Sequence, residues 1–148
     1  MQLLTFTLGG VKYGIPIQDV QSIEQKVQVV EIPNVLPYIR GIMNLHGNII
    51  PVYSLSTKFG YSEQLIENVV ITNVRGMLIG FEVCKVQEIL EVEGGHIAPM
   101  PELINCSQSY MKDVADHHKN LIVMLDVGEL VTKEEERDLR EMLEKEKA

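Results

Sequence analysis

The amino-acid sequence predicts an all-β protein with a C-terminal helix, in which two related halves make up the β-rich part. Short apolar segments are separated by glycine, proline and asparagine, with no helix between neighbouring segments, which favours small antiparallel barrels over a parallel sheet. Two long segments recur later in the chain at constant offsets, which indicates repeated architecture. Residues 132–148 instead follow the period of an amphipathic helix.

The repeats relate four segments of the chain in pairs. Residues 13–24 (YGIPIQDVQSIE) return as residues 79–90 (IGFEVCKVQEIL) at an offset of 66, and residues 38–55 return as residues 110–127 at an offset of 72. The identical pairs are Gly14/Gly80, Val20/Val86, Gln21/Gln87, Ile23/Ile89, Tyr38/Tyr110, His46/His118, Asn48/Asn120 and Ile50/Ile122. Both pairs of segments occur in the same order, as expected for two copies of one unit.

A lone half is too short to bury much apolar surface by itself. We therefore expect a single domain over residues 1–131, in which halves of about 13–55 and 79–127 exchange strands and share a core. The amphipathic helix of residues 132–148 follows that domain.

The first half begins with a predicted hairpin. Apolar and polar side chains alternate over residues 3–15 and turn at Gly9-Gly10, a pair that accepts the positive φ of a tight turn. Residues 27–33 (VQVVEIP) predict a further strand, and residues 36–42 favour a short helical turn. This order of elements contains no long helix.

The middle of the chain predicts a strand and a second hairpin. Residues 48–55 form an apolar run whose Pro51 must lie at an edge or bulge, because proline has no N–H to donate. Residues 69–83 alternate around a turn at Arg75-Gly76.

The chain closes with a buried strand and the amphipathic helix. Residues 120–127 (NLIVMLDV) predict the strand. Thr132 and Glu135 have the spacing of a capping box, and Val131 is positioned to staple the helix start. The apolar stripe is narrow and is expected to pack on the parent barrel; it consists of Leu139, Met142 and Leu143.

Composition excludes several classes of partner. The formal net charge of −8 and pI near 5.0 give no general attraction to nucleic acid or to anionic membranes, and an aromatic content of 5% offers few stacking platforms for bases. No apolar run approaches the roughly 20 residues that span a bilayer. Cys84 and Cys106 lack metal or redox spacing, so we expect a cytoplasmic protein with reduced thiols.

The sequence offers little for catalysis or metal binding. His117 and His118 lie close to Asp113 and Asp116, but neighbouring residues of a strand point to opposite faces, so a polar loop before a buried strand is the favoured interpretation. The alternative is a small metal-dependent hydrolase that uses these two histidines with His46. We predict no catalytic residue, no metal and no cofactor.

Three stretches in order resemble the CheW family, the coupling proteins of bacterial and archaeal chemotaxis: YGIPIQDVQSI, IPNVLPYIRGIMNLHGNIIPVYSL and IGFEVCKVQEIL. The resemblance runs from about Leu4 to Val131. It implies two intertwined five-stranded SH3-like barrels. It also implies a non-catalytic adaptor that joins the cytoplasmic tip of methyl-accepting receptors to the regulatory domain of the histidine kinase CheA, with higher-order arrays of CheW-like domains as a further expectation.

The resemblance places a receptor-binding groove on residues from both halves, namely Val20, Gly41, Ile42, His46, Val86 and Ile89. The apolar members of this set also fit ordinary core positions, and Gly41 also fits a plain backbone turn. Both interpretations remain open at this point.

The chain departs from the family pattern at two positions that are understood to pair. Ser22 stands where the family usually has an acidic residue, and His46 stands where it usually has arginine. Loss of both partners avoids a stranded charge. We expect the two side chains to face each other near Val20. Their replacement favours a divergent receptor set, or a CheA-like kinase in a pathway other than chemotaxis.

Overall fold

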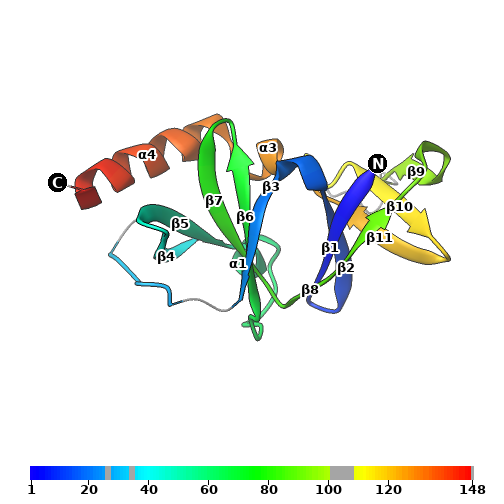
Figure 1. Cartoon of the computed structure of the whole chain (residues 1–148), viewed down its shortest axis with the longest axis horizontal. Coiled ribbons are helices and arrows are strands. Elements are labelled where there is room, and N and C mark those ends of the chain that lie inside the picture. The colour runs from blue at the N-terminus through cyan, green and yellow to red at the C-terminus, as the bar shows by residue number, and fades with distance from the viewer. Residues whose placement is uncertain (26–27, 34–35, 101–108, 148) are drawn as a thin grey trace.

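A computed structural model describes residues 1–25, 28–33, 36–100 and 109–147. It contains two β-sheets side by side along the longest axis, with a long helix against one of them (Figure 1). In hydrogen-bonded order, the six-stranded sheet consists of β8 (Lys85–Glu91), β1 (Gln2–Leu8), β2 (Val11–Pro16), β11 (Asn120–Met124), β10 (Asp113–His117) and β9 (Ile97–Pro99). The five-stranded sheet consists of β3 (Val20–Gln25), β6 (Asn68–Val74), β7 (Met77–Val83), β5 (Asn48–Ser54) and β4 (Ile39–Leu45).

The helices are short apart from the last. They are η1 (Ile17–Asp19), α1 (Leu55–Lys58), η2 (Gly94–His96), α3 (Val127–Leu130) and α4 (Lys133–Lys147). The predicted fold class, two intertwined barrel subdomains with a C-terminal helix, is confirmed; the one difference is the sixth strand of the first sheet, β9.

The two sheets repeat one topology. The order β8-β1-β2-β11-β10 matches β3-β6-β7-β5-β4 strand for strand. The parallel pairing of Met124 with Gly14 in one sheet corresponds to that of Val52 with Gly80 in the other. Gly14 and Gly80 are related by the offset of 66, and Val52 and Met124 by the offset of 72, so the two sequence repeats meet in equivalent parallel strand pairs.

The first repeated segment contains the crossing between the sheets. β2 lies in the six-stranded sheet, but β3, which follows it through η1, pairs with β6 in the other. In the second half β7 and β8 cross in the opposite direction, because β8 pairs with β1. The first half thus contributes β1 and β2 to one sheet and β3, β4 and β5 to the other, and the second half also contributes strands to both sheets.

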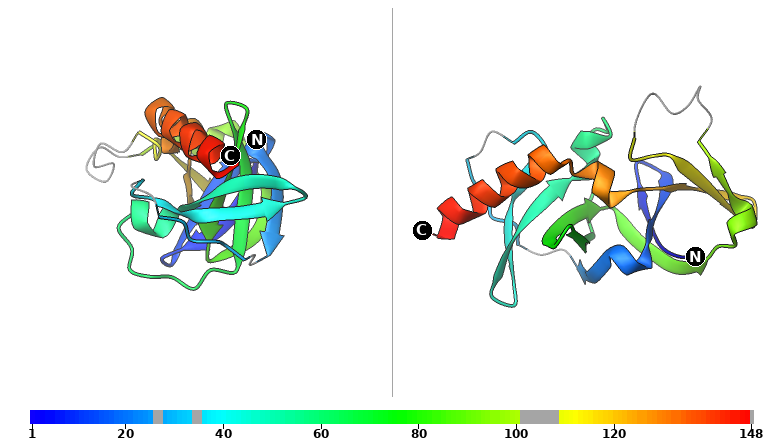
Figure 2. Two further views of the ribbon diagram at one scale, coloured as in Figure 1. Left: turned by 90° about the vertical axis from the view of Figure 1, so that its left-hand side faces the viewer. Right: turned by 90° about the horizontal axis from the view of Figure 1, so that it is seen from above.

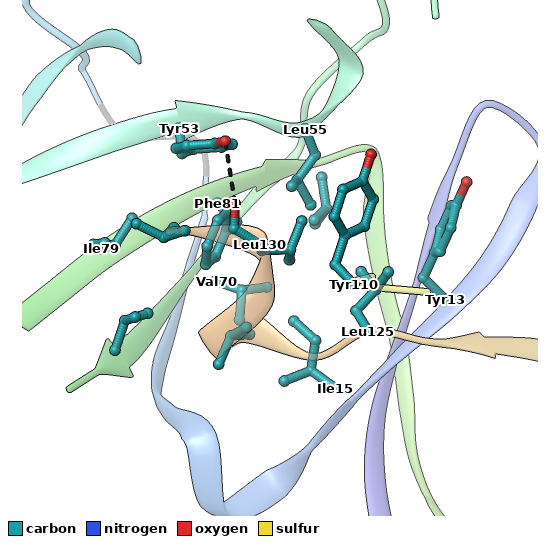
Figure 3. Packing of buried hydrophobic residues seen from close by; sticks show 14 of the residues in the cluster. Tyr13, Ile15, Tyr53, Leu55, Val70, Ile79, Phe81, Tyr110, Leu125 and Leu130 are labelled. Atoms are coloured by element: carbon teal, nitrogen blue, oxygen red, sulfur yellow. Dashed lines mark hydrogen bonds between the residues drawn. The ribbon is translucent and has the colours of Figure 1, made fainter. Parts of the chain in front are cut away.

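One large apolar cluster draws on both halves. It includes Phe6 and Ile15 from the six-stranded sheet and Tyr53 and Phe81 from the five-stranded sheet. Figure 3 shows these strands meeting around Leu130 of α3, whose carbonyl accepts a 3.4 Å hydrogen bond from the Tyr53 hydroxyl. Smaller clusters fill each barrel separately. The shared cluster explains why two short halves form one stable unit.

Both predicted hairpins are confirmed. Gly9 and Gly10 have φ values of 59° and 78°, and Arg75 and Gly76 have φ values of 50° and 86°. Two successive residues with positive φ match the right-handed twist of the flanking strands.

Two predictions before β5 are wrong. The strand expected over residues 27–33 is reduced to one bridge, in which Val30 and Ile42 exchange backbone hydrogen bonds of 2.8 and 3.0 Å; Val27 lies outside the described residues. The helical turn expected over residues 36–42 is a tight turn that leads directly into β4. The local pattern of apolar residues favoured a regular strand and a helical turn there. In the structure, contacts with the edge strand β4 determine the path of the backbone instead.

Pro51 and the polar segment before β11 also differ from what the sequence predicts. Pro51 lies within β5 opposite Ile42, and the β7 ladder begins only at Val52, so the missing N–H falls outside that ladder. The polar segment of His117 and His118, expected as a loop before a buried strand, is a strand end followed by a turn: β10 ends at His117 and lies between β11 and β9, and His118 begins the turn.

Gly41 allows the Val30 bridge to form. A Cβ atom at this position would lie 2.2 Å from the Val30 carbonyl oxygen, which is a backbone atom and cannot rotate away. We expect Gly41→Ala to separate the two segments and to lower the free energy of unfolding by about 1–3 kcal/mol. Urea unfolding measures this loss. Gly47→Ala is a poor control because of its φ of 87°, so Gly95→Ala, where a Cβ meets open space, serves instead and should cost much less.

The C-terminal helix begins with the predicted capping box. The Glu135 N–H donates to Thr132 Oγ1, and the Thr132 N–H donates to Glu135 Oε1, both at 3.1 Å. α4 then lies along the five-stranded sheet near β5, as the view from above in Figure 2 shows. Leu139 is fully buried, and Met142 and Leu143 pack against the shared cluster.

Candidate functional site

Two edge strands, β3 of one sheet and β8 of the other, meet at one point of the surface. The Asn68 side chain links them: its amide donates to the Glu24 carbonyl of β3 at 3.4 Å, and its oxygen accepts from the Val86 N–H of β8 at 3.0 Å. An open cavity of about 510 Å³ lies here; it is lined by Gln25, Leu65, Ile66, Glu67, Asn68 and Lys85. We call β3, β8 and this cavity the junction surface.

Three exposed apolar side chains lie on or beside the junction surface. Ile23 on β3 is 40% exposed, Ile89 on β8 is 53% exposed and Leu65 beside the cavity is 79% exposed. Ile23 and Ile89 occupy matching positions of the two halves. Large exposed apolar side chains on edge strands make the junction surface a candidate for binding another protein.

The bulges in the edge strands determine which side chains are available. In β3 the register shifts between Val20 and Ser22, and in β8 the corresponding shift lies around Gln87. Val20 and Val86 are consequently half-buried against the shared cluster, whereas Ile89 points outward. Of the predicted groove residues in the edge strands, Ile89 is the one positioned for contact without disturbing the core.

The other predicted groove residues lie on the opposite edge of the five-stranded sheet. Gly41 and Ile42 belong to β4, and His46 forms the tip of the β4–β5 hairpin with a φ of 51°. β3 and β4 are the two edge strands of that sheet. The structure therefore does not gather all six predicted residues around one cavity.

Ser22 and His46 are separated in the same way. Ser22 lies on β3, and its buried hydroxyl has no hydrogen-bond partner among the residues that the structure describes, so the two side chains make no hydrogen bond to each other. His46 is exposed. The two side chains thus do not pair directly, contrary to the expectation that they face each other near Val20.

The histidine pair of the second half forms a turn. His117 ends β10, His118 has a φ of 50°, and their rings pack edge-to-face with centroids 4.2 Å apart. Across the described residues, no group of three histidine, cysteine or acidic side chains is arranged to hold a metal ion. Cys84 donates to the Gln64 side chain at 3.6 Å, and Cys106 lies outside the described residues.

An ion pair that sequence reasoning missed lies near the β4 edge. Because of the β4 bulge between Ile39 and Gly41, Arg40 has no residue opposite it in β5. The Arg40 Nε donates to Glu82 Oε1 at 2.8 Å. The Glu82 side chain is only 8% exposed. Burial raises the pKa of Glu82, and Arg40 partly offsets that rise. Nothing in the local sequence links residues so far apart.

Comparison with known proteins identifies the family. The CheW-like domain model matches residues 2–135. A chemotaxis protein CheW from Klebsiella aerogenes is 31% identical over 140 residues, covering 90% of this chain and 83% of that protein. One from Treponema pallidum is 29% identical over 142 residues, covering 90% and 84%.

A solved structure agrees. The scaffolding protein TtCheW from Thermoanaerobacter tengcongensis superimposes with a TM-score of 0.81 at 26% identity, covering 90% of this chain and 89% of that one. No helix within the described ranges is long and apolar enough to cross a membrane. Sequence, topology and structural match agree that the chain belongs to the CheW-like domain family.

Proposed function

We propose that the protein is a non-catalytic chemotaxis adaptor that couples the cytoplasmic tip of methyl-accepting receptors to the histidine kinase CheA. Its similarity to a scaffolding protein and to chemotaxis CheW proteins supports the adaptor role. The observation that supports the receptor part is the junction surface, where each half presents an exposed isoleucine from an edge strand. Such a surface suits the apolar face of a helical hairpin. This role places the protein in the cytoplasm.

Ile89→Asp tests the receptor surface. The side chain is already more than half exposed, so the fold should survive, while a desolvated carboxylate at an apolar interface should weaken receptor-tip binding at least about tenfold. Leu121→Asp is the matched control, because Leu121 is 66% exposed on β11, away from the junction surface. Binding is measured with a purified receptor-tip fragment from the same cell. Equal losses of receptor-tip binding in Ile89→Asp and Leu121→Asp would contradict the assignment of the junction surface as the receptor site.

Bridging requires that both partners bind at once. We expect an immobilised CheA regulatory domain to retain the receptor tip only when the adaptor is present. The wild-type protein and Ile89→Asp should bind CheA equally. Mutually exclusive binding of the two partners would refute the coupling role.

A second candidate is a scaffold for a CheA-like kinase in a pathway other than chemotaxis. Ser22 and His46, which replace the usual charged pair, favour it. The same retention assay with each receptor and kinase of the cell distinguishes the two pathways.

A further inference from the structure

A small apolar pocket lies beside α4, at a distance along the sheet from the junction surface. Its volume is about 260 Å³, and it opens between α4, β5 and the turn before β4. Its apolar lining consists of Leu36, Pro37, Tyr38, Ile39, Tyr53 and Leu139. Cavities for cofactors and similar ligands measure about 300–1,000 Å³. This pocket suits a single side chain.

Three acidic residues of α4 line the same pocket. Glu135 is engaged internally, since it accepts hydrogen bonds from the Tyr53 hydroxyl and the Thr132 N–H. The carboxylates of Glu134 and Asp138 make no hydrogen bond or ion pair with any described residue. They are spaced i and i+4 on the helix, where like charges repel each other. The pocket therefore combines an apolar, aromatic lining with two carboxylates that have no partner in the described part of the chain.

The helix that carries these carboxylates is firmly held. Arg75 donates to the carbonyls of Gly128 and Val131 at 2.9 and 2.6 Å and pairs with Glu136. Arg140 also pairs with Glu136, at 3.1 Å. Because α4 is fixed on the sheet at both sides of the capping box, the pocket is formed before any partner arrives.

We propose that this pocket binds an arginine side chain of a partner protein. A guanidinium group stacks on tyrosine rings and forms forked hydrogen bonds to carboxylates, while its aliphatic stem packs on apolar surface. Tyr38, Leu139 and the pair Glu134 and Asp138 supply these three features. The net charge of −8 further attracts a basic partner. The inference is independent of the junction surface, so the two fail or hold separately.

NMR titration of the ¹⁵N-labelled full chain tests the proposal. The probe is the peptide acetyl-Gly-Leu-Arg-Leu-Gly-amide, and its counterpart carries citrulline, which has the same shape without the charge. We expect saturable shift changes centred on residues 36–39 and 134–139, with at least tenfold weaker binding of the citrulline peptide. Equal binding of both peptides, or shifts centred elsewhere, would overturn the proposal.

A charge-matched pair of variants isolates the carboxylates. The double variant Glu134→Gln/Asp138→Asn should fold normally, because it removes a like-charge pair, and should bind the arginine peptide at least tenfold more weakly. Glu63→Gln/Glu144→Gln removes the same charge from two exposed positions and should change binding less than twofold. A similar loss in both would mean that only net charge matters and would also overturn the proposal.

Discussion

Lys58→Met is expected to lower the free energy of unfolding by about 2–3 kcal/mol, because it removes a buried cation from the point where the two halves meet. The Lys58 side chain is 12% exposed, and its Nζ donates to the Leu130 carbonyl at 3.0 Å. Leu130 is the residue that corresponds to Lys58 in the second half. The ammonium also lies 4.9 Å from the ring centroid of Tyr38 and 5.2 Å from that of Tyr110, which correspond in the same way.

The lysine also connects two groups of aromatic rings. Tyr110 stacks on Phe59, which continues to Tyr13, and Tyr38 packs on Tyr53. Since the chain contains no tryptophan, tyrosine near-ultraviolet circular dichroism reports on this region directly. We expect Lys58→Met to change that spectrum as well as the urea midpoint. Lys85→Met, at an exposed lysine, should change neither; an equal effect there would contradict the assignment.

Arg40→Met is expected to cost about 2–3 kcal/mol at neutral pH, since it leaves the buried Glu82 carboxylate without its partner. The expected loss of unfolding free energy is smaller than for a fully buried ion pair because Arg40 is 35% exposed. Lys12→Met is the control. It breaks a 3.5 Å pair with the exposed Glu88 and should cost less than about 1 kcal/mol.

The pH dependence separates charge from packing. The pKa of Glu82 is raised in the folded protein, so the folded state binds its proton more tightly and this group's contribution to stability falls as pH rises through that raised value. Removing Arg40 raises the pKa further. Measured by urea unfolding, Arg40→Met should therefore lose much more free energy of unfolding relative to the wild-type protein at pH 7 than near pH 4. Adding Glu82→Gln to Arg40→Met should restore much of the loss at pH 7. Equal losses at both pH values would show that Arg40 acts through packing.

The hairpins and the capping box followed from local chemistry. Gly9-Gly10 and Arg75-Gly76 turn where alternating strands need positive φ, and Thr132 and Glu135 satisfy each other's backbone within one helical turn. Residues 113–117 were missed as a strand because their side chains are largely polar. β10 is stabilised by pairing with β11 on one side and β9 on the other, which a local pattern does not reveal.

The candidate site was predictable only in part. The sequence repeat marks both Val86 and Ile89 as candidate site residues. The β8 bulge, however, turns Val86 toward the core and leaves Ile89 exposed. Leu65 lies in an irregular segment, so no periodicity marks it as a surface residue. The groove predicted by family resemblance also divided between two opposite sheet edges.

The sequence by itself determined that one β-rich unit occurs twice, with its turns and its terminal helix, because periodicity and turn chemistry act over a few neighbouring residues and the offsets of 66 and 72 are visible along the chain. Only the tertiary structure decided which sheet each strand joins, which isoleucine remains exposed, and that Arg40 meets Glu82 and Lys58 meets Leu130. These contacts join residues 42 and 72 positions apart, and they form because two incomplete sheets bury their apolar faces against each other.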